Sequence, residues 1–149
     1  MIIRRARAED YAAFAAIEGE HPGYPAWGEK GFAAEEANRN SVTLAAEVEG
    51  RPAGFINFWI LRPQVQLNTL AVGRAALRGG VASALLGKLF EYAAKSACRE
   101  VDLEVNEHNA PALALYRRHG FEMVGKRPKF YNNTDAALLL RKVLPPKDL

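Results

Sequence analysis

The sequence has few of the residues on which several classes of protein depend. Its 149 residues include a single cysteine, Cys98, so a disulfide within the chain is excluded. Only three histidines occur, far apart along the chain, which argues against a metal centre built from histidine and cysteine. No apolar run approaches the ~18 residues that a membrane-spanning helix needs. We therefore expect no resident metal and no membrane partner.

Positive charge is in only slight excess, with 20 Lys and Arg against 17 Asp and Glu and a net charge of +3. This excess, without interleaved basic and aromatic residues, argues against a nucleic-acid partner. It is compatible with a ligand that carries several phosphates. The N-terminal sequence MIIRRARAEDY lacks the apolar core of a secretory signal, so we expect a cytoplasmic protein.

The composition, 49% hydrophobic and 25% charged, is that of an ordinary globular protein. The length suits one domain, residues 1–149, with a core of its own. Hydrophobic periodicity predicts the helices and strands. Strands are expected at 2–6, 42–48, 53–60, 64–72, 101–105, 121–125 and 136–143, and helices after Asp10, within 29–38, from Gly80 to about Ser96, and from Asn109 to Gly120.

Residues that favour helix ends support these boundaries. Asp10 and Asn109 are expected to be N-caps, Pro111 suits a first helical turn, and Gly120 suits a left-handed C-cap. The strand–helix–strand order from 64 to 105 predicts a parallel strand pair with a right-handed crossover. Hairpins precede and follow it. The predicted fold is therefore α/β (α+β), with a mixed, mostly antiparallel sheet, a central parallel strand pair and flanking helices.

Two glycines, Gly79 and Gly80, occur where the strand 64–72 gives way to a helix. Such a junction leaves backbone N–H groups uncovered at a helix N-terminus, and these groups bind phosphate well. The segment contains neither a Walker loop nor a full GxGxxG fingerprint. An ordinary turn is the alternative interpretation.

Two segments together resemble the GNAT superfamily of N-acetyltransferases. Leu77-Arg-Gly-Gly-Val-Ala82 is similar to its acyl-CoA motif, Gln/Arg-x-x-Gly-x-Gly/Ala, and departs from it at Leu77. The stretch from Glu104 to Phe121 resembles its second motif, Asn-x-x-Ala…Tyr-x-x-x-Gly-Phe. The residues in register are Asn109, Ala112, Tyr116, Gly120 and Phe121.

Within the superfamily the chain is most similar to the RimI-type ribosomal-protein-alanine N-acetyltransferases. Tyr24-Pro-Ala-Trp-Gly-Glu-Lys-Gly-Phe32 resembles their Phe-Pro-Trp-x-x-x-x-Phe segment, with Ala26 inserted. The resemblance implies acetyl-CoA as acyl donor, with Glu104 as general base and Tyr116 as general acid. It also implies a cofactor site whose residues are Leu70, Val72, Arg78, Gly79, Gly80, Val81, Ala82 and Asn109.

The chemistry of acyl transfer requires groups of these kinds. An α-amine has a pKa of about 7.7–8, so a carboxylate such as Glu104 can deprotonate it through water. The Tyr116 phenol, with a pKa of about 10, can protonate the departing thiolate. The N–H of Leu70 or Val72 could polarise the thioester carbonyl, while the pantetheine arm pairs with the strand. Cys98 has no adjacent base in the sequence, so we expect direct transfer.

The acceptor is expected to be a primary amine, and the N-terminal α-amine of a protein is the leading interpretation. One alternative is an acetyltransferase for a small amine such as a polyamine, an amino acid or an aminoglycoside. Another is a regulator that binds acetyl-CoA without turnover. The oligomeric state is left open, with a homodimer among the options.

Overall fold

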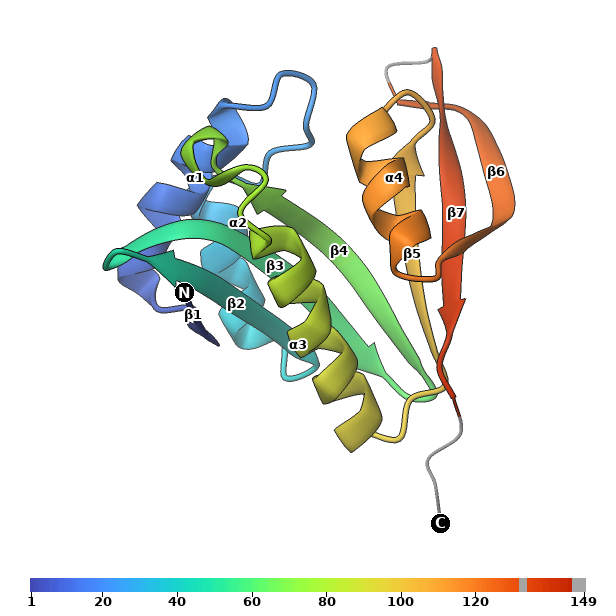
Figure 1. The fold of residues 1–149 in the computed structure, drawn as a ribbon, viewed down its shortest axis with the longest axis horizontal. Coiled ribbons are helices and arrows are strands. Elements are labelled where there is room, and N and C mark those ends of the chain that lie inside the picture. Colours follow the sequence, from blue (N-terminus) through green and yellow to red (C-terminus); the bar gives the residue numbers. More distant parts are fainter. Residues whose placement is uncertain (132–133, 146–149) are drawn as a thin grey trace. The chain divides into compact units, whose positions relative to one another are not determined.

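A computed structural model of the protein describes residues 1–131 and 134–145. Helices, short 3-10 helices (η) and strands follow one another along the chain (Figure 1). In order they are β1 (Ile2–Arg5), η1 (Ala8–Asp10), α1 (Tyr11–Gly19), α2 (Gly28–Ala34), η2 (Glu35–Ala37), β2 (Ser41–Val48), β3 (Arg51–Leu61), β4 (Gln64–Val72), η3 (Arg74–Ala76), α3 (Val81–Lys95), β5 (Glu100–Asn106), α4 (Ala110–Arg118), β6 (Glu122–Tyr131) and β7 (Asp135–Val143).

The strands form a seven-stranded sheet in the order β1-β2-β3-β4-β5-β7-β6. The pairs β1–β2, β2–β3, β5–β7 and β6–β7 are antiparallel. The pair β4–β5 is parallel and joins Gln64–Leu67 to Glu100–Leu103. The predicted mixed sheet with its parallel pair is thus confirmed.

Two compact units make up the chain. The first contains 1–59 and 69–91, and the second contains 60–68 and 92–149. The strand β4 and the helix α3 each begin in one unit and end in the other. Each unit is described below by itself.

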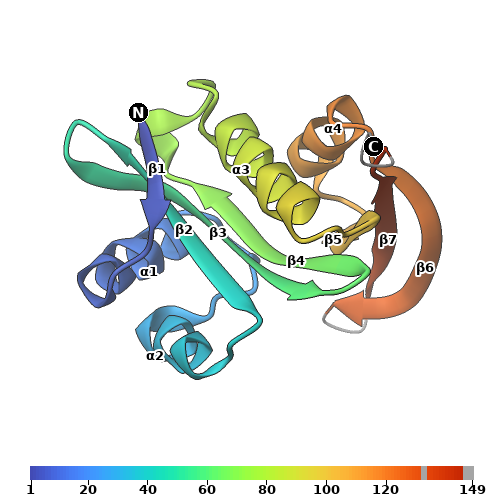
Figure 2. The ribbon, with the colours of Figure 1, turned by 90° about the horizontal axis from the view of Figure 1, so that it is seen from below.

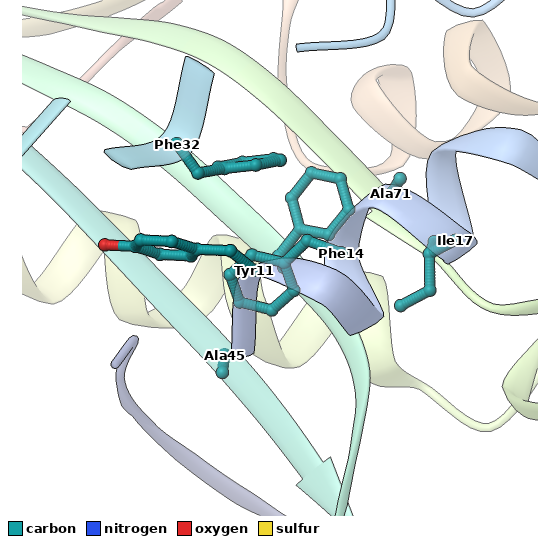
Figure 3. Packing of buried hydrophobic residues seen from close by; sticks show 7 residues of the cluster. Tyr11, Phe14, Ile17, Phe32, Ala45 and Ala71 are labelled. Carbon is teal, nitrogen blue, oxygen red and sulfur yellow. The ribbon is translucent and has the colours of Figure 1, made fainter. Parts of the chain in front are cut away.

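The first unit has helices on both faces of its strands. Figure 2 shows α1 and α2 on one face of β2 and β3 and the start of α3 on the opposite face. The aromatic rings of Tyr11, Phe14 and Phe32 meet beneath β3 (Figure 3). The Phe14 ring centroid lies 5.2 Å from that of Phe32 and 4.9 Å from that of Phe55. Burial of each such side chain stabilises the fold by about 1.5–3 kcal/mol.

The hairpin between β2 and β3 has a two-residue loop, Glu49-Gly50. Both residues have positive φ, 52° and 76°, as a type I′ turn requires. The following Arg51 and Pro52 already pair with β2, so β3 begins two residues earlier than the sequence predicted. A register shift between Ala46 and Glu47 accompanies the proline.

The second unit places α4 beside the hairpin of β6 and β7. Asn109 caps α4 as expected, because its side-chain oxygen accepts a hydrogen bond from the Ala112 N–H at 3.2 Å. Gly120, with φ 88°, follows the helix in the left-handed region, also as expected. The strand β6 extends to Tyr131, well beyond the predicted end at Gly125.

One predicted cap is wrong. Asp10 holds the position before α1, but its carboxylate makes no capping bond to that helix. It accepts two hydrogen bonds from the Arg4 guanidinium, at 2.7 and 2.9 Å, and one from the Arg7 N–H at 2.7 Å. The bidentate pair supplies two charge-assisted hydrogen bonds between opposite charges, which one bond to a helix N–H does not match, so the carboxylate turns to Arg4.

Within the described ranges, 1–131 and 134–145, no helix is long and apolar enough to cross a bilayer.

Candidate functional site

The predicted site residues divide between the two units. Leu70, Val72 and the segment 78–82 belong to the first unit. Glu104, Asn109 and Tyr116 belong to the second. The first group lies on β4 and at the start of α3, and the second lies on β5 and at α4.

The turn before α3 has an unusual backbone. Arg78 has φ 68° and Gly80 has φ 78°, both in the left-handed region. For a non-glycine residue this conformation costs about 1–2 kcal/mol. Strained residues of this kind cluster at ligand-binding sites. Leu77, Arg78 and the two glycines are all exposed, and Leu77 retains 53% of its accessible surface.

The amides that follow this turn point out of the helix end. The first hydrogen bond across the start of α3 runs from the Ala84 N–H to the Gly80 carbonyl at 3.0 Å. The N–H groups of a helix's first turn lack partners within the helix, so those of Val81 and Ala82 can bind an anion. The Val81 side chain is buried, with 3% exposed, and anchors the helix end.

Gly79 differs from the expectation that its N–H would be uncovered. That N–H donates to the Ala76 carbonyl at 3.3 Å. A Cβ at this position would lie 3.3 Å from the same oxygen. Gly79 therefore shapes the turn. A Cβ at Gly80, in contrast, would meet no atom within 4 Å, so the space above Gly80 is open to a ligand.

These features fit a diphosphate. A left-handed turn, an open glycine, the start of a 15-residue helix and the exposed cation of Arg78 come together within five residues. Backbone N–H groups and the helix dipole both favour negative charge at this place. The diphosphate of a coenzyme is a ligand of this chemistry.

Leu70 and Val72, the other predicted cofactor residues, contact the segment between α1 and α2 with backbone atoms. The Leu70 N–H donates to the Tyr24 hydroxyl at 3.0 Å, and that hydroxyl also lies 3.1 Å from the Leu70 carbonyl. The Val72 carbonyl is 2.8 Å from Nε2 of His21. The Leu70 amide is thus not open to a thioester as the chain stands, which the sequence did not predict.

Glu104 projects from β5 on the side opposite the buried Leu103 and Val105, as the alternation predicted. Its side chain is 29% exposed, and Oε1 lies 3.2 Å from Nη2 of Arg127 on β6. The neighbouring Glu107 makes a similar pair with Nζ of Lys126 at 3.6 Å. Both carboxylates at this end of β5 are therefore matched by a cation of β6.

Tyr116 lies on α4 and is buried, with 8% of its surface exposed. Its ring meets Phe121 edge-on, with centroids 5.5 Å apart. The Phe121 N–H donates to the Tyr116 carbonyl at 3.0 Å. Phe121 thus packs on the Tyr116 ring with its side chain and bonds to the Tyr116 backbone with its N–H.

Comparison with known proteins fits this arrangement. The family model described as acetyltransferase (GNAT) family matches residues 7–121, more than half of the chain. The chain belongs to this family. The [ribosomal protein bS18]-alanine N-acetyltransferase of Escherichia coli K12 is 31% identical over 119 residues, which cover 80% of this chain and 79% of that protein. Its crystal structure superposes with a TM-score of 0.86 at 25% identity, covering 99% of this chain and 97% of that one.

Other relatives of this GNAT chain are much longer. An uncharacterized protein of Mycobacterium leprae is 32% identical over 132 residues, 85% of this chain and 35% of that protein. The mycothiol acetyltransferase of Clavibacter michiganensis is 41% identical over 80 residues, 54% of this chain and 26% of that protein. The chain thus spans about a third of the first relative and about a quarter of the second.

The surroundings of Cys98 do not favour a catalytic nucleophile. Its side chain is 7% exposed, and burial raises the pKa of the thiol. The reactive form of cysteine is the thiolate, which burial in apolar surroundings disfavours. The Sγ atom lies 3.6 Å from the Gln64 carbonyl. Among the described residues, no group of three or more His, Cys, Asp or Glu side chains is placed to hold a metal ion.

Sequence reasoning missed three contacts of the GNAT motifs. Arg127 lies 23 residues from Glu104, and His21 and Tyr24 lie about 50 residues from their partners on β4. No local pattern links residues so far apart. The position of Tyr24 within the segment 24–32 was the only signal, and it did not identify β4 as the partner.

Proposed function

We propose that this chain transfers an acetyl group from acetyl-CoA to the N-terminal α-amine of a protein. The observation that carries the proposal is the strained turn at Arg78 and Gly80 before α3, in a chain of the GNAT family. The family match includes residues of both compact units, which supports one acetyltransferase domain over residues 1–149. A cytoplasmic location remains part of this proposal.

The segment 78–82 would hold the diphosphate of acetyl-CoA. The N–H groups of Val81 and Ala82 would donate to phosphate oxygens above Gly80, and Arg78 would add a positive charge at the solvent side. Backbone amides would supply most of the donors to the diphosphate. Acetyl-CoA could therefore bind although Leu77 replaces the glutamine or arginine of the motif.

Glu104 would accept a proton from the acceptor amine through a water molecule. The neutral amine then attacks the thioester carbon, a carbon–nitrogen bond forms, the carbon–sulfur bond breaks, and the nitrogen releases its second proton to solvent. The Tyr116 hydroxyl would give its proton to the departing thiolate, and the hydroxyl regains a proton from solvent. The Tyr116 ring is buried and packs edge-on against Phe121, which supports this role, because a general acid must be held in position. No covalent acetyl-enzyme is required.

The charges near Glu104 favour a peptide amine over a polycation. Glu104 pairs with Arg127 and Glu107 with Lys126, so two carboxylates that could attract a polyamine are already matched. An α-amine also suits a carboxylate base better than a lysine amine does, because the lysine pKa of about 10.4 leaves far less neutral amine at pH 7. The name of the Escherichia coli relative indicates the same type of acceptor.

A small amine is the second candidate, favoured by the partial similarity to mycothiol acetyltransferase. Mass spectrometry can separate the two. The protein and acetyl-CoA are incubated with a peptide that begins with free alanine, with its N-blocked form carrying an internal lysine, and with a panel of small amines. We expect acetylation of the free-alanine peptide alone.

Each other result has a clear meaning. Acetylation of the blocked peptide or of small amines, without the free peptide, refutes the α-amine proposal. Binding of acetyl-CoA with no acetylation across the panel favours the non-catalytic regulator. Glu104→Gln removes a proton acceptor together with its ion pair to Arg127, and Tyr116→Phe removes a proton donor, so both variants should have lower turnover while they still bind acetyl-CoA. Retained activity in both would refute the assigned roles.

A further inference from the structure

The segment from His21 to Tyr24 bonds to backbone groups of β4 with which a neighbouring strand would otherwise pair. The Leu70 N–H and carbonyl both contact the Tyr24 hydroxyl, at 3.0 and 3.1 Å. Thr69, with 6% exposed, presents Oγ1 to the same hydroxyl. A phenol can accept two hydrogen bonds and donate one, so all three contacts are compatible when Thr69 donates.

The bonded edge of β4 is the one that faces away from β3. The Gly73 N–H donates to the Ala53 carbonyl of β3 at 2.8 Å. Backbone groups alternate sides along a strand, so those of Leu70 and Val72 point to the opposite edge. At that edge the parallel pairing with β5 covers Gln64–Leu67, before Leu70 is reached. An antiparallel partner would exchange both its N–H and C=O with Leu70, and the Tyr24 hydroxyl substitutes for it.

The segment is held at its far end by a buried carboxylate. Glu18, with 2% exposed, accepts the N–H of Trp27 at 2.7 Å and that of Gly28 at 3.0 Å. At the other end, side chains make the contacts with β4: Nε2 of His21 lies 2.8 Å from the Val72 carbonyl, and the Tyr24 hydroxyl lies 3.1 Å from the Leu70 carbonyl. Residues 21–24, the tip of this segment, thus contact β4 through side chains, which a ligand can replace without breaking a pairing between strands.

We propose that Tyr24 and His21 occupy the β4 edge only until the acyl donor binds, and that acetyl-CoA displaces them. The inference rests on the proposed function and on the expectation from the sequence that the pantetheine arm of acetyl-CoA pairs with β4 as a strand would. The arm and the Tyr24 hydroxyl compete for the same N–H and carbonyl of Leu70. Donor binding therefore releases the tip of the segment that precedes Trp27, and Tyr24 is a positioning residue that links the donor site to the acceptor-side segment.

Because the Tyr24 hydroxyl competes with the donor for Leu70, its removal should strengthen the binding of acetyl-CoA. Tyr24→Phe removes the competing hydroxyl and leaves the ring, so acetyl-CoA should bind about threefold to tenfold more tightly, the equivalent of one ordinary hydrogen bond. Isothermal titration calorimetry with acetyl-CoA measures this directly. The matched control is Tyr11→Phe, which removes a hydroxyl bonded to Glu36 at 3.0 Å in the same unit and should leave the affinity unchanged.

A second measurement follows the segment itself. In a Trp59→Phe chain, Trp27 is the remaining tryptophan, and its emission should change when acetyl-CoA binds. In a Trp59→Phe, Tyr24→Phe chain the tip is already released, so the change on binding should be smaller. Emission from Trp27 that does not respond to a bound donor overturns the proposal, whether or not Tyr24→Phe folds well enough for titration.

The outcomes separate this inference from the proposed function. A wild-type chain that binds no acetyl-CoA refutes the proposed function and this inference with it. If the wild-type chain binds acetyl-CoA and Tyr24→Phe binds it equally well or more weakly, only the displacement is refuted. Weaker binding would indicate that the Tyr24 hydroxyl contacts the bound donor.

Discussion

The turn at Gly80 supports a thermal test of the donor site. Gly80→Val places a branched side chain in space that is empty in the chain, where a Cβ would meet no atom within 4 Å. The φ of 78° makes the substitution cost about 1–2 kcal/mol or more for an L-residue. In a chain of this length, the melting temperature should fall by about 2–4 °C for each kcal/mol lost.

The effect on ligand binding should be larger and of a different kind. Acetyl-CoA at a hundred times its Kd stabilises the wild-type chain by about 2.7 kcal/mol. That corresponds to a rise in melting temperature of roughly 5–11 °C. In Gly80→Val the added side chain fills the space that the diphosphate would occupy, so the rise should vanish. Differential scanning fluorimetry with and without acetyl-CoA measures both quantities in one experiment.

Gly50→Val is the matched control. Gly50 has nearly the same φ, 76°, and a Cβ there also meets no atom within 4 Å, but it lies in the hairpin loop between β2 and β3. It should lose a similar amount of stability and keep the full shift with acetyl-CoA. An undiminished shift in Gly80→Val, or a loss of the shift in both variants, would refute the assignment of the diphosphate to this turn.

Four further substitutions test the chemistry and the fold. Tyr116→Phe should lower turnover on the order of tenfold to a thousandfold, while Cys98→Ala keeps turnover near the wild-type value, and an acetyl adduct trapped on Cys98 would contradict direct transfer. Glu104→Gln should lower turnover chiefly at the lower end of the range from about pH 6 to pH 8, where less amine is neutral, and equal loss at every pH would argue against a base. The Arg4 guanidinium lowers the pKa of the buried Asp10 below its ordinary value, so the pair stabilises the fold above the unfolded pKa of about 3.9, and this stability is lost as the pH falls through the lower folded value. Urea unfolding between about pH 2 and pH 6 should show this loss in the wild-type chain and much less of it in Asp10→Asn, and parallel curves would contradict the pairing.

The features that the sequence predicted well depend on neighbours along the chain. The alternation of Val101, Leu103 and Val105 placed Glu104 on the less buried side of β5, and it lies there. Asn109 caps its helix because the partner is three residues away. The sheet class followed from the order of strands and helices, since a parallel pair needs a crossover of this length.

The features that were missed or wrong depend on residues brought together by the fold. The pairing of Glu104 with Arg127 requires β6 to run past its predicted end, and the length of β6 depends on its partner β7. Asp10 was assigned a cap from its local context, but Arg4, held by the strand pairing of β1 with β2, offers it a stronger bond. Tyr24 reaches Leu70, 46 positions further along the chain, only after the intervening segment has folded.

Because Cys98 is buried, thiol-specific reagents should react with the protein only slowly. It is the only cysteine of 149 residues, it is 7% exposed, and burial raises its pKa, so a disulfide dye added to a reaction will report released CoA with little background from the protein. The same property makes the chain convenient to label. Ala26 is exposed and lies two residues after Tyr24. A fluorophore attached to Ala26→Cys in a Cys98→Ala chain would follow the segment in real time as substrates arrive.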